Sequence, residues 1–342
     1  MLTETRPAQI RILLASVALA LLPGCGTMYL LQAAHGEAQV LDRRQPIAKV
    51  IRSPRTPPPL RATLEQVQEA RNFATEVLGL PNNRSYRTYS NIGRPYVVWN
   101  VVAAPEFSVE PKLWCFPIVG CVAYRGYFSE KKARKFASDL KTQGFDVVVD
   151  GVPAYSTLGR FADPVMSTML PYGNVELASI IFHELTHQLL YVPGDSSFNE
   201  AFATTVEREG VRRWLLYQGR IADLKRYEQE NALELEYVQL FRRTRAELEK
   251  LYASGLPVPV MRERKRSTFA ALASQMRQLQ RQAKGESPYE DWLEDGLNNA
   301  DLTSVATYYD CMPGFQRLLQ SDNGNLRRFY SDVRDLAREP QA

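Results

Sequence analysis

Two histidines and a glutamate are spaced so that they could bind a metal ion and activate water. His183, Glu184 and His187 form the pattern H-E-x-x-H within an apolar stretch of helical length. Residues four positions apart lie one above the other on a helix, so both imidazole rings can reach one zinc ion. Glu184 would then face the open position of that ion. The pattern predicts a zinc hydrolase; the alternative is a buried helix whose two histidines are hydrogen-bonded inside the core.

The third ligand of this expected site must be a carboxylate. A catalytic zinc ion takes three protein ligands and keeps one position open for water. The chain has three histidines, and the remaining one, His35, comes before a proline-rich segment near the N-terminus. A Pro-Gly turn between two helical stretches would let them pack face to face and bring Glu200 to the ion. Asp195 and Glu207 are the competing carboxylates.

Glu200 could instead have a purely structural role. Ser197 and Glu200 have the spacing of a capping box, in which the glutamate only closes the start of the second helix. The groups that orient the histidine rings are equally open at this point. Asn199 or Glu207 could accept the second N–H of a ring and hold it in place.

Hydrolysis also needs a donor that stabilises the oxyanion as charge develops on the substrate carbonyl. No spare histidine remains for that task, so a tyrosine or an arginine must serve. Tyr155, which comes shortly before the histidine pair, and Tyr309 are the candidates among the 17 tyrosines. For either residue, a role in packing is the alternative.

The N-terminal residues have the features of a signal peptide. Basic residues precede an apolar run over residues 12–22, which is too short to cross a membrane as a stable helix. Residues 22–25 resemble a bacterial lipobox, with cleavage before Cys25 and a lipid on its sulfur. An ordinary secretory signal is the alternative. The sequence therefore predicts that residues 1–24 are removed and that a lipoprotein remains, anchored to the outer membrane and facing the periplasm.

Two of the four cysteines flank a short loop, at Cys115 and Cys121. An oxidising periplasm would allow them to pair. Because such a small loop removes little chain entropy, a bridge here would mainly fix a local turn.

The order of the expected elements favours an α+β fold that is mostly helical, with a small mixed sheet, a metal-binding helix and long C-terminal helices. Residues 25–60 would form an anchored helix and a stiff proline-rich spacer. A catalytic domain over residues 61–342 would be β-rich to about residue 173 and helical from about residue 174. Within it we expect a helix from a capping box at Thr63 to about Gly79, strands at 96–102, 114–127 and 145–149, a helix at 129–143, Asn174 as N-cap of the metal helix, and charged helices at 199–253 and 262–284. By its order in such a fold, the strand over 145–158 would offer its edge to an extended peptide.

The charge of the chain gives no reason to expect a nucleic-acid partner. The 42 basic and 38 acidic residues give a net charge of +4, and the basic residues are dispersed beside acidic ones, as on solvated helix faces. A hydrophobic content of 45% is enough for a substantial core.

The histidine motif and the downstream residues Asn199-Glu200-Ala-Phe-Ala resemble those of the gluzincin clan of zinc metallopeptidases. More closely, the chain resembles the bacterial putative aminopeptidase family of lipoproteins over almost all of its mature length. The resemblance includes Tyr29-Leu-Leu-Gln-Ala-Ala-His-Gly, Arg43-Arg-Gln-Pro-Ile47, Tyr124-Arg-Gly-Tyr-Phe-Ser-Glu, Tyr155-Ser-Thr-Leu-Gly, Asp163-Pro-Val-Met-Ser-Thr-Met-Leu, Asn298-Asn-Ala and Ala306-Thr-Tyr-Tyr-Asp310.

This resemblance implies that His183, His187 and Glu200 bind one Zn²⁺ and that Glu184 is the general base on a zinc-bound water. It implies a peptidase, in name an aminopeptidase, with peptide or protein substrates. The competing hypothesis is an envelope binding or chaperone-like lipoprotein whose zinc site is structural. A structural site normally has four protein ligands, and no further histidine is close in the sequence, which favours the catalytic reading. The substrate, the choice between internal and terminal cleavage and the oligomeric state stay open.

Overall fold

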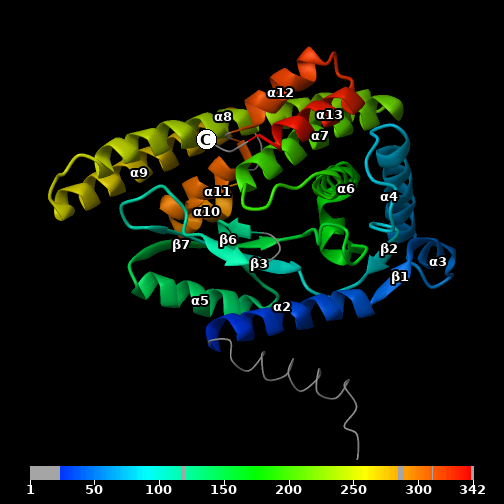
Figure 1. The fold of residues 1–342 in the computed structure, drawn as a ribbon, viewed down its shortest axis with the longest axis horizontal. Helices are drawn as coiled ribbons and strands as arrows, with labels where there is room; N and C mark the ends of the chain where they lie inside the picture. The colour runs from blue at the N-terminus through cyan, green and yellow to red at the C-terminus, as the bar shows by residue number, and fades with distance from the viewer. Residues whose placement is uncertain (1–23, 117–119, 284–288, 310, 340–342) are drawn as a thin grey trace, which may run out of the picture.

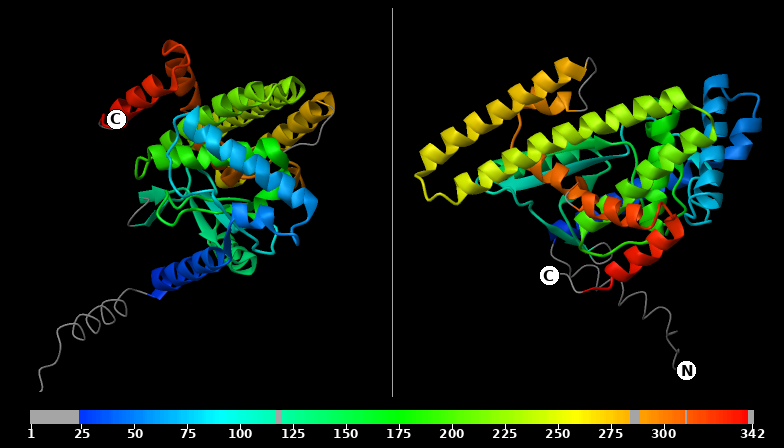
Figure 2. Two further views of the ribbon diagram at one scale, coloured as in Figure 1. Left: turned by 90° about the vertical axis from the view of Figure 1, so that its right-hand side faces the viewer. Right: turned by 90° about the horizontal axis from the view of Figure 1, so that it is seen from above.

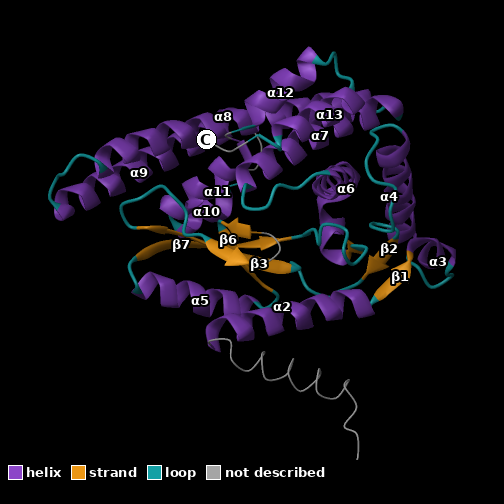
Figure 3. Cartoon of the chain, viewed as in Figure 1, coloured by secondary structure: helices purple, strands orange, loops and turns teal. Residues whose placement is uncertain are grey.

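The computed structural model describes residues 24–116, 120–283, 289–309 and 311–339. Apart from Gly24, the expected signal peptide lies outside the described residues. The fold is α+β and mostly helical, as predicted, and Figure 3 shows the few strands enclosed by helices. None of the helices in the described part of the chain is long and apolar enough to cross a membrane.

The N-terminal segment folds into the main body of the protein. Its elements are α2 (Gly24–Asp42), β1 (Arg44–Pro46), α3 (Ile47–Arg52) and α4 (Pro58–Glu76). Val40 at the end of α2 and Ile47 at the start of α3 are buried in the same apolar cluster as the later helices. The chain from α2 onward therefore shares one core with the remainder of the fold.

The expected proline-rich spacer and capping box are corrected by the structure. The helix begins at Pro58, five residues before the predicted start at Thr63, and no side chain caps its N-terminus. A proline can occupy the first turn of a helix because the N–H that it lacks would have no partner there. Only the short stretch between α3 and α4 is left as a connection.

The strands divide into three small sheets instead of the single sheet that was expected. One sheet is mixed, in the order β1-β2-β8, with β1 antiparallel and β8 parallel to β2; a second is antiparallel, in the order β6-β3-β7; and a two-stranded hairpin pairs β4 with β5. The remaining strands are β2 (Thr88–Ser90), β3 (Val98–Pro105), β4 (Trp114–Phe116), β5 (Gly120–Val122), β6 (Tyr124–Tyr127), β7 (Phe145–Val152) and β8 (Val165–Met166).

The antiparallel sheet lies at the centre of the molecule and is covered by helices on both faces (Figure 1). Strand β3 pairs along its whole length with β7, from Val98 opposite Val152 to Pro105 opposite Phe145. Helix α5 (Glu130–Thr142) packs against one face, and α11 (Asn299–Tyr309) also packs against β3 and β7. Because β3 is covered on both sides, its buried residues form a nearly continuous run instead of alternating.

The C-terminal half is helical, but the expected long helix over residues 199–253 is two helices. Helix α7 (Ser196–Tyr217) and helix α8 (Ile221–Tyr252) are separated at Gly219, which adopts a left-handed backbone with φ of 68°. Figure 2 shows α8 and α9 (Val258–Ala283) as a hairpin that extends beyond the rest of the molecule, with its own apolar cluster. The last helices are α10 (Glu290–Asp295), α12 (Met312–Ser321) and α13 (Leu326–Leu336).

Candidate metal centre

The two histidines lie on α6 (Gly173–Leu189), a helix whose opposite face is fixed in the core. Ile181, Phe182 and Leu185 are completely buried, and the histidine face is turned away from them. A short 3-10 helix over Ser167–Tyr172 leads directly into α6, so the helix starts one residue before the expected N-cap Asn174 and has no side-chain cap. The chain thus passes from the 3-10 helix into α6 without a capping side chain.

The capping-box interpretation of Glu200 is wrong, because a different residue caps α7. The side chain of Asp195 accepts a hydrogen bond from the backbone N–H of Phe198 at 2.9 Å, which is the N-cap contact. Glu200 therefore lies in the second turn of α7, with no part in closing the helix start. Its side chain instead faces α6.

A close approach of α6 and α7 brings Glu200 to the histidines. Gly210 on α7 makes this approach possible, since a Cβ at that position would lie 2.9 Å from the ring of Phe182 and 2.8 Å from Leu78. The loop between the helices is held by Asn199, whose side chain exchanges hydrogen bonds with the backbone N–H and C=O of Val192 at 2.8 and 2.7 Å. Asn199 thus fixes the loop and does not orient a histidine ring.

His183, His187 and Glu200 form one compact group of potential metal ligands. The Nε2 atoms of the two histidines lie 3.1 Å apart, and Oε2 of Glu200 lies 3.1 Å from Nε2 of His183 and 3.5 Å from Nε2 of His187. All three side chains are mostly buried, with exposed fractions of 14%, 8% and 15%. Among the described residues these three form the group that could hold a metal ion.

The spacing of these atoms fits a tetrahedral ion. Zinc binds histidine nitrogen and carboxylate oxygen at about 2.1 Å, which places two ligands of a tetrahedral site about 3.4 Å apart. The separations of 3.1 to 3.5 Å in the group match that value. A site with three protein ligands also keeps one position open, as a catalytic site requires.

Glu207 orients the first histidine. Its Oε2 lies 2.9 Å from Nδ1 of His183, and its Oε1 accepts a hydrogen bond from the hydroxyl of Ser179 at 2.6 Å. With Nδ1–H donating to Glu207, the lone pair of Nε2 points toward the ligand group. Of the carboxylates that competed with Glu200, Asp195 is therefore the helix cap and Glu207 is the partner of a histidine.

Burial and neighbouring charges shift the pKa values of Glu200 and of Glu184 beside it. Burial by itself would raise the pKa of Glu200, but the charge of His187 and hydrogen bonds from His183 and His187 hold that pKa far below its usual range. Burial raises the pKa of Glu184, and the two histidines oppose the rise only in part. The pKa values of the two glutamates therefore shift in opposite directions: that of Glu200 is lowered, which favours its charged form, and that of Glu184 is raised, which favours its protonated form.

A cavity of about 850 Å³ opens beside the ligand group. One side is formed by His183, Glu184, His187 and Glu200. The other sides are mostly apolar and come from α2, from strands β3, β5 and β6, and from the chain that follows β7. The sequence predicted that the strand over 145–158 lies beside the site, and the end of β7 does line the cavity. The other outer strand of the same sheet, β6, also lines it, through Tyr124 and Gly126.

The two tyrosines proposed from the sequence lie in different places. Tyr155 lines the 850 Å³ cavity, where its hydroxyl donates a hydrogen bond to Glu37. Tyr309 lines a second cavity of about 1030 Å³, and its hydroxyl donates to Glu234. Tyr309 is therefore not in the cavity that holds Glu184.

Tyr191 and Tyr124 line the first cavity and were missed by sequence reasoning. Tyr191 continues the four-residue spacing of the histidine pair, and its ring centroid lies 6.3 Å from that of His187. Burial, and then the charge of Glu200, raises the pKa of Tyr191, so its hydroxyl keeps its proton at neutral pH. Helical spacing gave no signal for Tyr191, because α6 ends at Leu189 and Leu190 is extended.

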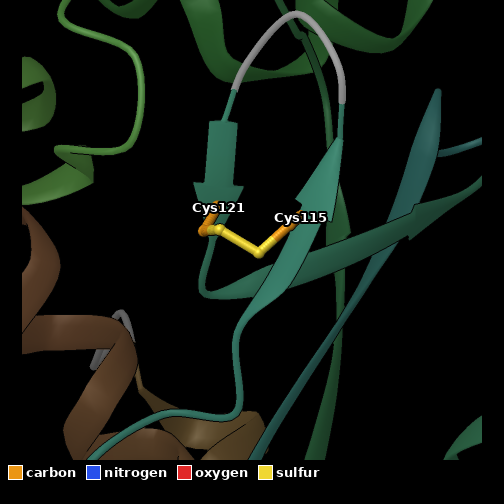
Figure 4. The surroundings of a disulfide bond; sticks show 2 residues. All are labelled: Cys115 and Cys121. Carbon is orange, nitrogen blue, oxygen red and sulfur yellow. A yellow bond between two sulfur atoms is a disulfide. The ribbon is translucent and has the colours of Figure 1, made fainter.

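The cysteine pair forms a disulfide at the base of the β4–β5 hairpin (Figure 4). The hairpin contacts the loop between α6 and α7, since a Cβ at Gly120 would lie 2.6 Å from the backbone nitrogen of Gly194. The bridge therefore joins two strands, one of which packs at Gly120 against the loop that follows α6. Cys25, the expected lipid site, is the second residue of α2.

One protein-family model matches residues 28–342, and its description is "Putative aminopeptidase". No curated protein and no solved structure matches the chain.

Proposed function

Because the chain belongs to the putative aminopeptidase family, we propose that it is a zinc-dependent peptidase of the bacterial cell envelope, with one Zn²⁺ held by His183, His187 and Glu200. The observation that carries the proposal is the compact group of two histidines and one carboxylate, open on one side to the cavity that also contains Glu184. Three protein ligands and an adjacent carboxylate are the parts of a hydrolytic zinc site and not of a closed structural one.

Glu184 and Glu207 have different roles in the proposed hydrolysis. A bound zinc ion would lower the pKa of water to about 7 and polarise the scissile carbonyl. Glu184 accepts the proton of the attacking water and delivers it to the leaving amine. Burial raises the pKa of Glu184, and a higher pKa makes its carboxylate a stronger base toward the proton of that water. Glu207 holds the ring of His183 so that Nε2 stays aimed at the ion.

Tyr191 is the preferred donor to the oxyanion. It lines the same cavity as Glu184 and retains its proton, whereas Tyr309 lines the second cavity. Tyr191 is preferred because its ring lies next to that of the proposed ligand His187, with 6.3 Å between the centroids. Tyr155 also lines the first cavity and is the second candidate.

The envelope location is part of the proposal and rests on the N-terminal sequence, with Cys25 as the lipid-bearing residue. The first turns of α2 are consistent with a position near a membrane surface, since Met28 and Leu31 are 67% and 52% exposed. A lipid on Cys25 would place these apolar side chains close to the bilayer.

The experiment compares metal content and hydrolysis in the wild type and in Glu184→Gln. The wild type should hold one zinc ion per chain and cleave members of a peptide library. Glu184→Gln should hold the same amount of zinc and lose activity by about 10²–10⁴-fold, the usual contribution of a general base. Glu176→Gln is the matched control, because Glu176 lies on the same helix but lines the second cavity.

Three results would count against the proposal. Full activity in Glu184→Gln would remove that residue from its role. Zinc in the purified protein without cleavage of any peptide would favour the alternative, a binding or chaperone-like lipoprotein with a structural ion. Cleavage with no metal present would reject zinc dependence itself.

A further inference from the structure

The 850 Å³ cavity has apolar walls that the proposed hydrolysis does not use. Its polar wall is the ligand group together with Glu184. Much of the remaining lining comes from two segments that are far apart in the sequence. One segment is α2, and the other is the loop over residues 156–162, which follows β7 and which we call the cavity loop.

The cavity loop is held directly against the metal helix. Gln188, which follows His187 on α6, donates from its side-chain amide to Oδ2 of Asp163 at 3.1 Å. The same buried carboxylate accepts from the backbone N–H and the hydroxyl of Thr157, at 3.2 and 2.5 Å. A Cβ at Gly159 would lie 3.1 Å from Oε1 of Gln188, so the loop and the helix are in close contact. These contacts fix the loop to the residue next to a proposed zinc ligand.

Two residues of the cavity loop have a strained backbone. Leu158 and Ala162 adopt left-handed conformations, with φ of 56° and 54°, which residues other than glycine rarely adopt. Such conformations persist only where the surrounding structure fixes them, and they are concentrated at binding sites and active sites. Here Asp163 fixes one end of the loop. The guanidinium of Arg44 donates to the carbonyls of Phe161 and Ala162, at 2.6 and 3.3 Å.

The strained loop places large apolar side chains at the cavity. Leu158 and Phe161 both line it, and Phe161 is 51% exposed. Leu30 of α2 lines the same cavity and is also exposed. A ligand with an apolar side chain would cover these groups and remove their surface from water, which stabilises the complex.

Helix α2 contributes small side chains where it lines the cavity. Ala34 and Ala38 are four residues apart and therefore lie on the same face of the helix. The helix is tied to the sheet by Gln32, whose side-chain amide donates to the carbonyl of Gly126 at 3.3 Å and accepts from the N–H of Phe128 at 3.2 Å. Because two methyl groups occupy little space, this firmly held wall leaves room in the cavity for a side chain larger than their own.

We propose that the cavity loop and α2 form a subsite for a large apolar side chain of the peptide substrate, and that Phe161 determines this preference. This inference rests on the proposed peptidase function and names its substrate class: peptides with a large apolar residue close to the bond that is cleaved. The occupant is a peptide because the ligand group, where that bond must lie, is part of the same cavity.

The experiment measures binding in the Glu184→Gln protein with zinc added, so that hydrolysis plays no part. Calorimetry compares tetra-alanine with the four tetrapeptides in which one alanine is replaced by phenylalanine. We expect at least one of the four to bind about ten- to a hundredfold more tightly than tetra-alanine, because a phenylalanine side chain becomes buried. Laurate is a further probe, since an acyl chain could also occupy apolar walls.

Adding Phe161→Ala should lower that ratio about fivefold, the contribution of an aromatic pair. The side chain is exposed and the bond from Arg44 is to the backbone, so the variant keeps the contacts that fix the loop. Ala34→Trp fills part of the cavity from α2 and should lower the ratio as well. Leu113→Ala is the matched control, because Leu113 is also an exposed apolar residue outside helices and strands but does not line the cavity. It should preserve the ratio.

The outcomes are separable. Equal binding of all five peptides, or a preference that Phe161→Ala leaves unchanged, would overturn the proposal even if the wild type is an active peptidase. Binding of laurate that Phe161→Ala weakens, with no preference among the peptides, would assign the walls to a lipid chain and reject the peptide subsite. A preference that depends on Phe161, in a protein whose wild type cleaves no peptide, would reject the peptidase function and retain the subsite.

Discussion

Oε2 of Glu207 lies 2.9 Å from Nδ1 of His183, and Ser179 holds the other oxygen of the same carboxylate at 2.6 Å. This chain of contacts joins α7 back to α6 and selects the ring nitrogen that faces the ligand group. His187 differs, because its buried Nδ1 has no hydrogen-bond partner among the described residues. The two histidines are thus unequally held, and His183 is the one whose orientation is built into the fold.

The first prediction follows from this asymmetry. Glu207→Ala should weaken zinc binding by about 10–100-fold, the usual effect of losing a group that orients a ligand, whereas Glu207→Gln should weaken it less because an amide oxygen can still accept from Nδ1–H. Titration of the apoprotein with zinc against a competing chelator measures the affinity. Glu209→Gln is the control, since Glu209 lies on the same helix but pairs with Arg212 and Arg213. Equal zinc affinity in Glu207→Ala and wild type would contradict the assigned role.

The second prediction concerns the packing of α2 against Phe128. A Cβ at Gly36 would lie 2.0 Å from Cγ of the Phe128 ring, so Gly36→Ala must separate α2 from Phe128, the residue that follows β6. We expect a loss of about 1–3 kcal/mol in the free energy of unfolding, the usual cost of overpacking, measured by urea denaturation. Because the shift also moves the wall that carries Glu37, activity should fall in the folded variant.

Gly314→Ala is the matched control for that change. Gly314 is also helical, and nothing lies within 4 Å of a Cβ built there. Replacement by alanine should therefore leave stability unchanged or raise it by up to about 1 kcal/mol. A Gly36→Ala protein as stable as the wild type would show that α2 does not pack closely against Phe128.

The third prediction is a pH dependence of stability centred on Asp301. Burial raises the pKa of Asp301 to about 8 in the folded protein, with the charges of Asp150 and Asp146 adding to the rise, while its ordinary value is near 3.8. The folded state therefore binds this proton more tightly than the unfolded state. Its contribution to stability is complete at low pH and is lost as pH rises from about 4 to about 8, by at most about 1.4 kcal/mol per pH unit.

Comparison with Asp301→Asn isolates this contribution. The amide oxygen can still accept from the N–H of Asn298, which now donates to Asp301 at 2.7 Å, but the side chain cannot ionise. Urea unfolding at pH 5 and pH 8 should show a larger loss of stability in the wild type than in the variant. The same loss in both proteins would place the titrating group elsewhere.

The clustering of His183, His187 and Glu200 could be predicted from sequence because the information for it is local. His183 and His187 need only one helix, and Glu200 needs only the next helix packed against it. The choice between ligand and capping residue for Glu200 was not local, since it depended on Asp195 taking the cap. The fold class was also predictable from the order of apolar and charged stretches, although short strands such as β2 and β8 left no sequence signal of their own.

Glu37 and Tyr309 show where sequence reasoning failed, for opposite reasons. Glu37 lies in the cavity because α2 folds back over residues about a hundred positions later in the chain, through Gln32 and Gly126. No periodicity within α2 encodes that contact. Tyr309 has a suitable side chain, but α11 places it in the neighbouring cavity with Glu234.

Helix α2 also limits the distance between the cavity and a membrane to which the protein would be anchored. Since a helix rises 1.5 Å per residue, Glu37 lies roughly 18 Å along α2 from Cys25. Helix α2 runs along the body of the protein and does not form a free stalk (Figure 1). A lipid on Cys25 would therefore hold the cavity within a few nanometres of the bilayer, and peptides would meet the enzyme in the thin layer of solution next to the membrane.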